Sequence, residues 1–237
     1  MQNCNGTFLF ESKPRISAFA SVVGKKEAQG PLREDFDKII YDSYCGQDTF
    51  EKAETEMMRT AVELALEKGE MMREEIDVAF CGDLLNQCVA SSFAMSGFGI
   101  PYAGIYGACS TMALGLMMSA LAVESGAATR AVCAASSHYC TAERQYRFPL
   151  EYGSQRPPTA QWTVTGSGAC VVEADSEAHQ SRRANHARED NGRQTIYPNT
   201  RMPYIRSARL GIITDYAITD QNNMGAAMAP ANVKIGT

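Results

Sequence analysis

A nearly uncharged run at residues 110–125 constrains the fold of this chain most, because its one charged residue is Glu124. A run of this length without a polar face predicts a helix that is buried on all sides. The small-residue turn at 107–111, Gly-Ala-Cys-Ser-Thr, comes just before the run and puts Cys109 at the first turn of the helix. Unpaired N–H groups and the helix dipole at such a position favour a bound anion or a thiolate. We therefore expect Cys109 at the floor of a ligand site, with or without chemistry there.

Strand and helix patterns alternate on both sides of this run. An amphipathic helix over residues 50–68 follows a strand at 15–23, and the residues before it resemble a capping box with Asp48 as the N-cap. The other expected elements are strands at 76–81, 101–106, 131–136 and 163–173 and a helix at 84–96. The alternation predicts an α/β fold with parallel strands joined by right-handed crossovers.

Three residues follow successive predicted strands: Asp83, Cys109 and His138. Because ligand sites in parallel sheets gather beyond the carboxyl ends of the strands, we expect the three at one edge of the sheet. Cys109 also fits a small core residue, and a nucleophilic role would need a neighbouring base. His138 fits a proton or hydrogen-bond donor to a ligand carboxylate, and equally an anchor for its own loop. Asp83 fits a carboxylate that orders its own turn, or one that orients His138 or an arginine.

Two arginines follow in a polar stretch after His138, at Arg144 and Arg147. They are candidate counter-charges for a dicarboxylate, since guanidinium groups pair with carboxylates bidentately. A solvated loop in which Glu143 and Glu151 are the ion partners is the alternative. The expected ligand-binding residues are therefore Cys109, His138, Asp83, Arg144 and Arg147.

Composition excludes several classes of protein. The net charge of −5 argues against a nucleic-acid-binding surface. The eight cysteines are too far apart for a C-x-x-C pair, so we expect free thiols, no metal site and no cofactor. The N-terminus lacks the pattern of a signal peptide, and the most apolar run, 112–123, is shorter than the roughly 20 residues that span a bilayer. Any membrane association is expected to be peripheral.

The character of the chain changes after residue 175. Residues 176–209 contain seven arginines, no lysine and three acidic residues, which is typical of an exposed insertion. We therefore divide the chain into residues 1–175, an Arg-rich insertion or loop at 176–203, and a last segment at 204–237.

Six short motifs in this order resemble the stage V sporulation protein AD family of endospore-forming bacteria. They are residues 82–87, 107–111, 136–138, 141–145, 163–168 and 224–230. The resemblance implies a thiolase-like fold, in which two βαβαβαββ halves form five layers with a buried helix from each half at the centre. It also puts Cys109 at the position of the thiolase nucleophile, identifies 1–175 as the first half, and implies that 204–237 begins a second half that is largely missing.

The same resemblance implies a non-enzymatic function. Members are implicated in binding dipicolinate (pyridine-2,6-dicarboxylate), free or as its calcium chelate, and in its uptake into the forespore. They act with other SpoVA proteins, which implies a cytoplasmic protein peripheral to the forespore or spore inner membrane, and thiolase-like proteins are often homodimers. The alternatives are an acyl transferase that uses Cys109, like thiolases or ketoacyl synthases, and a non-functional truncated remnant. Acyl transfer would need partners that the family's second half supplies.

Overall fold

The computed structural model describes residues 1–4, 6–146, 163–175, 202–210 and 231–236. The strands are β1 (Gln2–Cys4), β2 (Thr7–Leu9), β3 (Arg15–Gly24), β4 (Lys38–Ile40), β5 (Val78–Asp83), β6 (Tyr102–Gly104), β7 (Arg130–Ser137), β8 (Gly166–Glu173), β9 (Tyr204–Leu210) and β10 (Ala231–Gly236). The helices are α1 (Phe50–Lys68), α2 (Val89–Met95), α3 (Thr111–Glu124) and α4 (Tyr139–Tyr146), with 3₁₀ turns η1 (Glu27–Gln29), η2 (Arg33–Asp35), η3 (Arg73–Glu75), η4 (Asn86–Cys88) and η5 (Ala108–Ser110).

The ten strands of the described residues belong to one sheet with the order β1-β2-β9-β3-β8-β7-β5-β6, with β10 paired to β9 and β4 to β3. The strand β5 is parallel to both β6 and β7, as the alternation of strands and helices predicts. The strand β8 is antiparallel to its neighbours β3 and β7. Antiparallel neighbours need no helical crossover, so the sheet is mixed rather than fully parallel.

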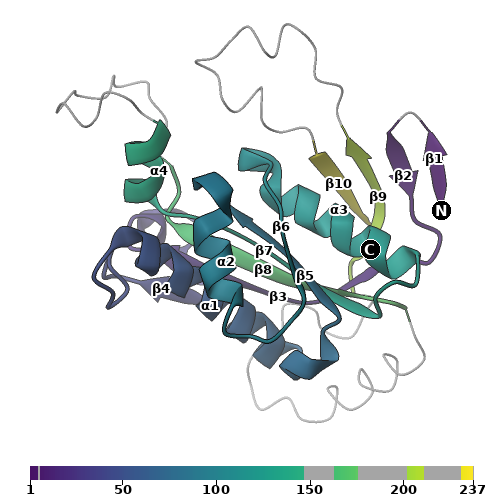
Figure 1. Ribbon diagram of the computed structural model, residues 1–237, viewed down its shortest axis with the longest axis horizontal. Helices are drawn as coiled ribbons and strands as arrows, with labels where there is room; N and C mark the ends of the chain where they lie inside the picture. The colour runs from purple at the N-terminus through teal and green to yellow at the C-terminus, as the bar shows by residue number, and fades with distance from the viewer. Residues whose placement is uncertain (5, 147–162, 176–201, 211–230, 237) are drawn as a thin grey trace, which may run out of the picture.

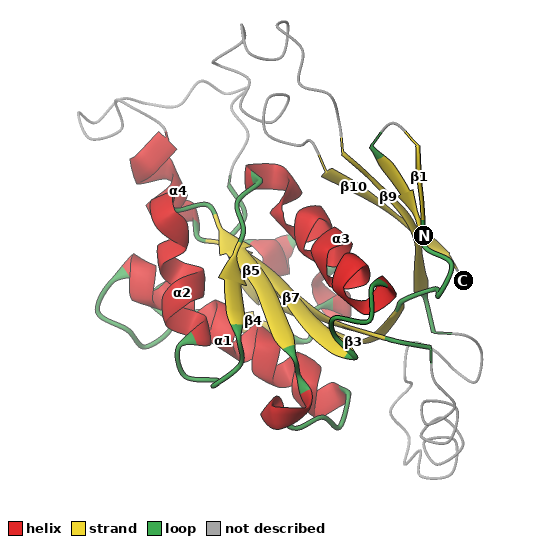
Figure 2. Cartoon of the chain, turned by 45° about the vertical axis from the view of Figure 1, so that its right-hand side comes forward, coloured by secondary structure: helices red, strands yellow, loops and turns green. Residues whose placement is uncertain are grey.

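The helices lie in layers around this sheet (Figure 1). The helices α1 and α2 cover one face, and α3 lies against the other face over β5 and β7. The far end of the sheet, β9 and β10, also contacts α3, so this helix lies between two parts of the sheet (Figure 2). Helices, sheet, central helix and further strands are the layers expected of a thiolase-like fold.

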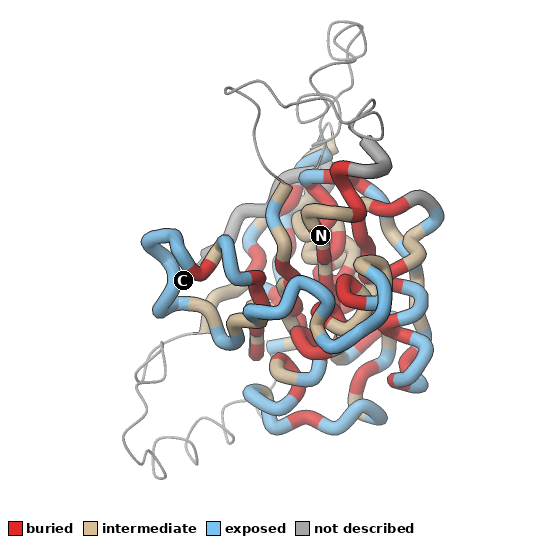
Figure 3. The backbone as a smooth tube through the Cα atoms, turned by 90° about the vertical axis from the view of Figure 1, so that its left-hand side faces the viewer, coloured by how far each residue is buried: buried red, intermediate tan, exposed pale blue. Residues whose placement is uncertain are grey.

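The larger part of the core lies between α1 and the sheet. Helix α1 has the predicted bounds and buries a stripe that includes Met57, Ala61 and Ala65 against the inward side chains of the strands. Its N-cap is Thr49, whose hydroxyl accepts the Lys52 N–H at 3.2 Å, and not the predicted Asp48. Figure 3 shows the buried segments running through the middle of the molecule, with exposed segments around them.

Helix α3 confirms the element predicted from the uncharged run, but not its complete burial. Gly115 lets the helix approach the sheet, because a Cβ there would lie 3.0 Å from the Cys133 Cβ and 3.2 Å from the Phe80 carbonyl oxygen. Met117 and Val123 are buried on the side that meets β9. Ser119 and Ala120 are buried as well. Other side chains of the helix are only half-buried, although they pack against the same cluster; they include Leu114, Leu116, Met118 and Leu121.

The expected division of the chain into 1–175, 176–203 and 204–237 stays a prediction. Most of the Arg-rich segment, 176–201, lies outside the described residues. The strands of the last segment, β9 and β10, join the same sheet as β2 and β3. Among the described helices, none has the length and apolarity that crossing a membrane requires.

Candidate functional site

Asp83 ends β5 and is almost fully buried, with 1% of its surface exposed. One carboxylate oxygen accepts the Leu85 N–H at 2.9 Å, and the other accepts the Ser91 N–H at 2.7 Å. Burial raises the pKa of Asp83, and the hydrogen bonds from Ser91 and Leu85 oppose that change. One oxygen therefore orders the turn that follows β5, as expected, and the other holds the first turn of α2.

His138 follows β7 directly and is 1% exposed. Its Nε2 lies 2.9 Å from the Ser43 carbonyl oxygen, and its Nδ1 accepts the Cys140 N–H at 3.2 Å. This pattern assigns the proton to Nε2, and burial lowers the pKa of the ring, so a neutral imidazole fits the site. The ring also stacks on Phe50 with centroids 5.1 Å apart. His138 thus fastens the loop around Ser43 to the start of α4.

Glu54 of α1 is a functional-site candidate that the sequence analysis missed. It is fully buried, and its two oxygens accept the hydroxyls of Ser136 at 3.0 Å and Thr141 at 2.9 Å. Burial raises the pKa of Glu54 to about 7; nearby Asp83 adds to that rise, and the hydroxyl hydrogen bonds oppose it. The signal in the sequence was a carboxylate on the apolar stripe of a helix, three residues before Met57.

Cys109 lies in the turn η5, just before α3, and its side chain is exposed. The turn approaches the sheet so closely that a Cβ on Gly82 would lie 2.0 Å from the Ile105 carbonyl oxygen and 2.7 Å from Thr111 Cγ2. Ala108 takes a left-handed conformation with φ of +44°. Glycine at position 82 is thus what allows the Cys109 turn to sit against the end of β5.

The predicted site residues share one edge of the sheet but not one face. Asp83 pairs in register with Ser136, so β5 and β7 end side by side. Successive side chains of a strand point to opposite faces, so Gly82 faces the Cys109 turn and Asp83 faces away from it. Asp83 contacts α2, while His138 stacks on Phe50 of α1. The sheet therefore separates Cys109 from the other two, and a ligand role for any of them stays a prediction.

A cavity of about 150 Å³ opens beside His138, and we call it the His138 pocket. Its polar wall contains two lysines, Lys25 and Lys26, and two carboxylates, Glu27 and Asp42. The other lining residues are Gly24, Ile40, Ser43, Cys45, Met57, Tyr139, Cys140, Thr163 and Thr165. The pocket thus combines two cations with hydroxyl groups at the ends of β3, β7 and β8.

The two carboxylates of the His138 pocket differ in what they bind. Both oxygens of Asp42 accept backbone N–H groups, from Tyr44 at 3.0 Å and Gly46 at 2.8 Å, which lowers the pKa of Asp42. Glu27 accepts the Thr165 N–H at 3.1 Å with Oε1, while its Oε2 is buried without a hydrogen-bond partner. The wall therefore contains one carboxylate oxygen, Oε2 of Glu27, that accepts no hydrogen bond from the described residues.

The structure does not show the two predicted arginines at this pocket. Arg144 belongs to α4, whose first residues Tyr139 and Cys140 line the pocket, and Arg147 lies outside the described residues. Their predicted role as counter-charges stays a prediction. In the described part of the chain, no group of three or more His, Cys, Asp or Glu residues is arranged to hold a metal ion.

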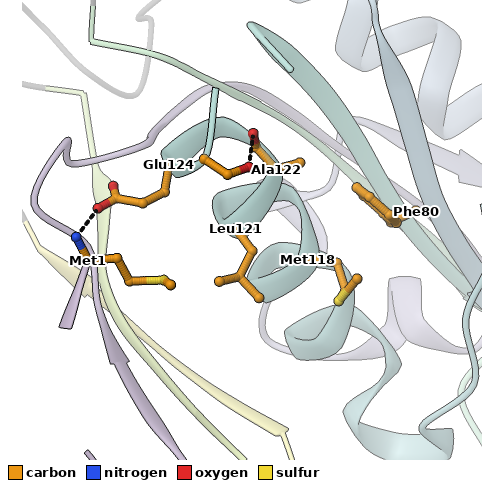
Figure 4. A pocket seen from close by; sticks show the side chains of 7 residues that line it. Met1, Phe80, Met118, Leu121, Ala122 and Glu124 are labelled. Carbon is orange, nitrogen blue, oxygen red and sulfur yellow. Dashed lines mark hydrogen bonds and ion pairs between the residues drawn. The ribbon is translucent and has the colours of Figure 1, made fainter. Parts of the chain in front are cut away.

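A larger cavity of about 370 Å³ lies between α3 and the N-terminus (Figure 4). Met118, Leu121 and Phe80 give it an apolar wall. At its rim, the N-terminal ammonium group of Met1 lies 3.1 Å from a carboxylate oxygen of Glu124. None of the predicted site residues lines this cavity.

Comparisons with known proteins agree with this architecture. The family model for stage V sporulation protein AD matches residues 4–236. The chain belongs to this family. It is 38% identical over 225 residues to stage V sporulation protein AD of Bacillus subtilis strain 168, and the match covers 95% of this chain and 60% of that protein. The chain therefore spans about 60% of the length of this relative, and the predicted sporulation family is confirmed.

Comparison with solved structures shows the fold of this chain. The cerulenin-bound OleA of Xanthomonas campestris matches with a TM-score of 0.51 and 13% identity, covering 97% of this chain and 74% of that one. The 3-oxoacyl-(acyl carrier protein) synthase III (FabH) of Xanthomonas oryzae matches with a TM-score of 0.50 and 13% identity, covering 94% and 72%. At such identities the likeness concerns the fold alone, and it confirms the predicted thiolase-like α/β fold.

Proposed function

We propose that this member of a sporulation family binds dipicolinate, free or as its calcium chelate, in the His138 pocket, and so supports dipicolinate uptake into the forespore. In this proposal the protein acts as a binding protein and not as an enzyme. In the same proposal it works as a homodimer beside other SpoVA proteins, peripheral to the forespore inner membrane. The observation that carries the proposal is a pocket that combines a predicted site residue, His138, with two lysines.

The charges of the pocket wall favour a ligand that carries both signs. Lys25 and Lys26 suit the two carboxylates of dipicolinate, because ammonium groups pair with carboxylates. The carboxylate of Glu27 would repel a free dianion, but carboxylate oxygens are suitable ligands for calcium. The neutral calcium chelate satisfies both kinds of group. We therefore expect the chelate to bind more tightly than free dipicolinate.

Acyl transfer by Cys109 is the second candidate. The exposure of Cys109 at the start of α3 favours it, as an exposed thiol at a helix N-terminus is suited to nucleophilic attack. The position of His138 argues against acyl transfer. Among the described residues His138 is the one histidine, and backbone groups bind both of its ring nitrogens. It also lies across the sheet from Cys109. No described imidazole is therefore placed to activate the thiol.

Calorimetric titration tests the proposed binding directly. Dipicolinate is titrated into the protein with and without calcium, and into the double variant Lys25→Met/Lys26→Met. We expect saturable binding that is tighter with calcium, and a loss of about tenfold or more in affinity in the double variant, as removal of charge-assisted hydrogen bonds predicts. Lys52→Met is the control, since Lys52 lies on the surface of α1 and pairs with Asp48 at 2.8 Å. No heat at millimolar ligand, or equal affinity in the double variant, contradicts the proposal.

A further inference from the structure

Two cysteines face each other across neighbouring strands in the middle of the sheet. Cys133 of β7 and Cys170 of β8 are direct partners in the antiparallel register. Opposed residues of an antiparallel pair project from the same face, with Cα atoms about 4.5 or 5.5 Å apart. A disulfide spans Cα separations of about 4.4–6.8 Å. The backbone therefore already holds this pair at a distance that a disulfide can bridge.

The side chains of the pair are also in contact. The hydrogen bond to Cys170, together with burial, holds the pKa of Cys133 well above its ordinary value. Cys133 is fully buried beneath α3, whereas Cys170 is half-buried. An oxidant that enters from solvent therefore reaches the sulfur of Cys170 first, and Cys133 is the thiol next to it.

We propose that Cys133 and Cys170 are a redox modification site that forms a cross-strand disulfide with a peroxide. Hydrogen peroxide oxidises the Cys170 thiol to a sulfenic acid and releases one water. The Cys133 sulfur then attacks the Cys170 sulfur, the S–O bond breaks, and the Cys133 proton leaves with the hydroxyl group as a second water. Two thiols and one peroxide thus give one disulfide and two waters.

The other thiols of the described residues are less suited to this reaction. Cys81 of neighbouring β5 pairs in register with Ala134 and packs in the core beneath α1, on the opposite face from Cys133. Cys45 and Cys140 both line the His138 pocket and are the competing pair. A Cys133–Cys170 link would join two strands whose ends carry His138 and Thr165 into that pocket.

The test is oxidation of the reduced, native protein with hydrogen peroxide. Remaining thiols are blocked with N-ethylmaleimide in denaturant, and digested peptides are identified by mass spectrometry. We expect a peptide pair joined through Cys133 and Cys170 that dithiothreitol separates, and a melting temperature raised by about 5 °C or more. Cys140→Ser, a change at a half-buried thiol outside the pair, should keep the link, and Cys170→Ser should lack it.

Two results would overturn the proposal. One is the recovery of both Cys133 and Cys170 as maleimide adducts after oxidation. The other is a disulfide between Cys45 and Cys140, or between two chains through Cys109, in place of the cross-strand link.

Discussion

The two faces of the sheet differ in the burial of their candidate site residues. On the face covered by α1 and α2, Glu54, Asp83 and His138 are buried, and each gives its polar atoms to hydroxyl or backbone groups. On the α3 face, the turn that packs closely against Gly82 carries Cys109, whose side chain is exposed. The three titratable groups of the first face therefore hold the fold together, while Cys109 on the second face presents its thiol to solvent. The position of a residue at the edge of the sheet therefore does not show whether its side chain is a buried structural group or an exposed reactive one.

Removal of the Glu54 side chain should have the largest effect on stability. Glu54→Ala leaves a cavity, takes the acceptor from the Ser136 hydroxyl and leaves the Thr141 hydroxyl with the His138 carbonyl oxygen alone. We therefore expect a loss of about 4 kcal/mol in the free energy of unfolding at pH 5. Urea denaturation measures this loss. Glu67→Gln, a change at an exposed carboxylate of the same helix, should stay within about 0.5 kcal/mol. A loss below about 1 kcal/mol for Glu54→Ala would mean that the buried face is not built around this carboxylate.

The same carboxylate should make stability depend on pH. The pKa of Glu54 rises from 4.5 to about 7 in the folded chain, so between these values the folded state holds a proton that the unfolded state has released. The free energy of unfolding therefore falls as pH rises from 4.5 through 7, by about 3 kcal/mol. Glu54→Gln keeps Asp83 and His138 and removes this titration. The difference between the two proteins, measured in urea from pH 4.5 to 8, isolates Glu54, and parallel curves would contradict the prediction.

The turn on the α3 face should be sensitive to a single methyl group. Gly82→Ala would put a Cβ 2.0 Å from the Ile105 carbonyl oxygen, a backbone atom, so the Cys109 turn must move. We expect a loss of about 2–3 kcal/mol in stability and a changed rate of Cys109 alkylation. Gly97→Ala is the control, because the nearest atom to its Cβ is the flexible Arg59 guanidinium at 4.0 Å. Equal stability of both variants would show that the turn is not held against β5.

Cys109 itself should contribute little to stability. Cys109→Ser changes an exposed side chain, so we expect the free energy of unfolding to stay within about 0.5 kcal/mol. Thermal and urea denaturation measure it. A loss above about 1.5 kcal/mol would indicate a packed core thiol, and the contrast between the two faces would not hold.

Local patterns in the sequence account for much of the fold. The stripe at 50–68 and the uncharged run at 110–125 predict α1 and α3, because side-chain periodicity and burial are local properties of a helix. The order of strands and helices predicts the parallel neighbours of β5. The turn before α3 is also predictable, since Cys109 adjoins the uncharged run.

The site depends on contacts that sequence order does not contain. His138 bonds the Ser43 carbonyl group, 95 residues away, and this contact closes one wall of the His138 pocket. Lys25 and Lys26 enter the pocket from the end of β3, so no motif near His138 indicates them. The burial of Glu54 is not predictable from the sequence, because a carboxylate on a helix usually faces solvent. The face on which each strand-end side chain lies depends on the register of its strand. A shift of one residue in a predicted strand boundary moves that side chain to the other face, so the sequence does not predict the face.

Alkylation of individual cysteines with and without calcium dipicolinate tests the proposed site most directly. Cys45 and Cys140 line the His138 pocket, and Cys109 lies exposed on the other face, so the chain carries reporters for both faces. Mass spectrometry measures the rate at which N-ethylmaleimide modifies each thiol. We predict that the ligand slows the modification of Cys140 and Cys45 and leaves that of Cys109 unchanged. Protection of Cys109 alone would contradict the assignment and move the ligand to the α3 face.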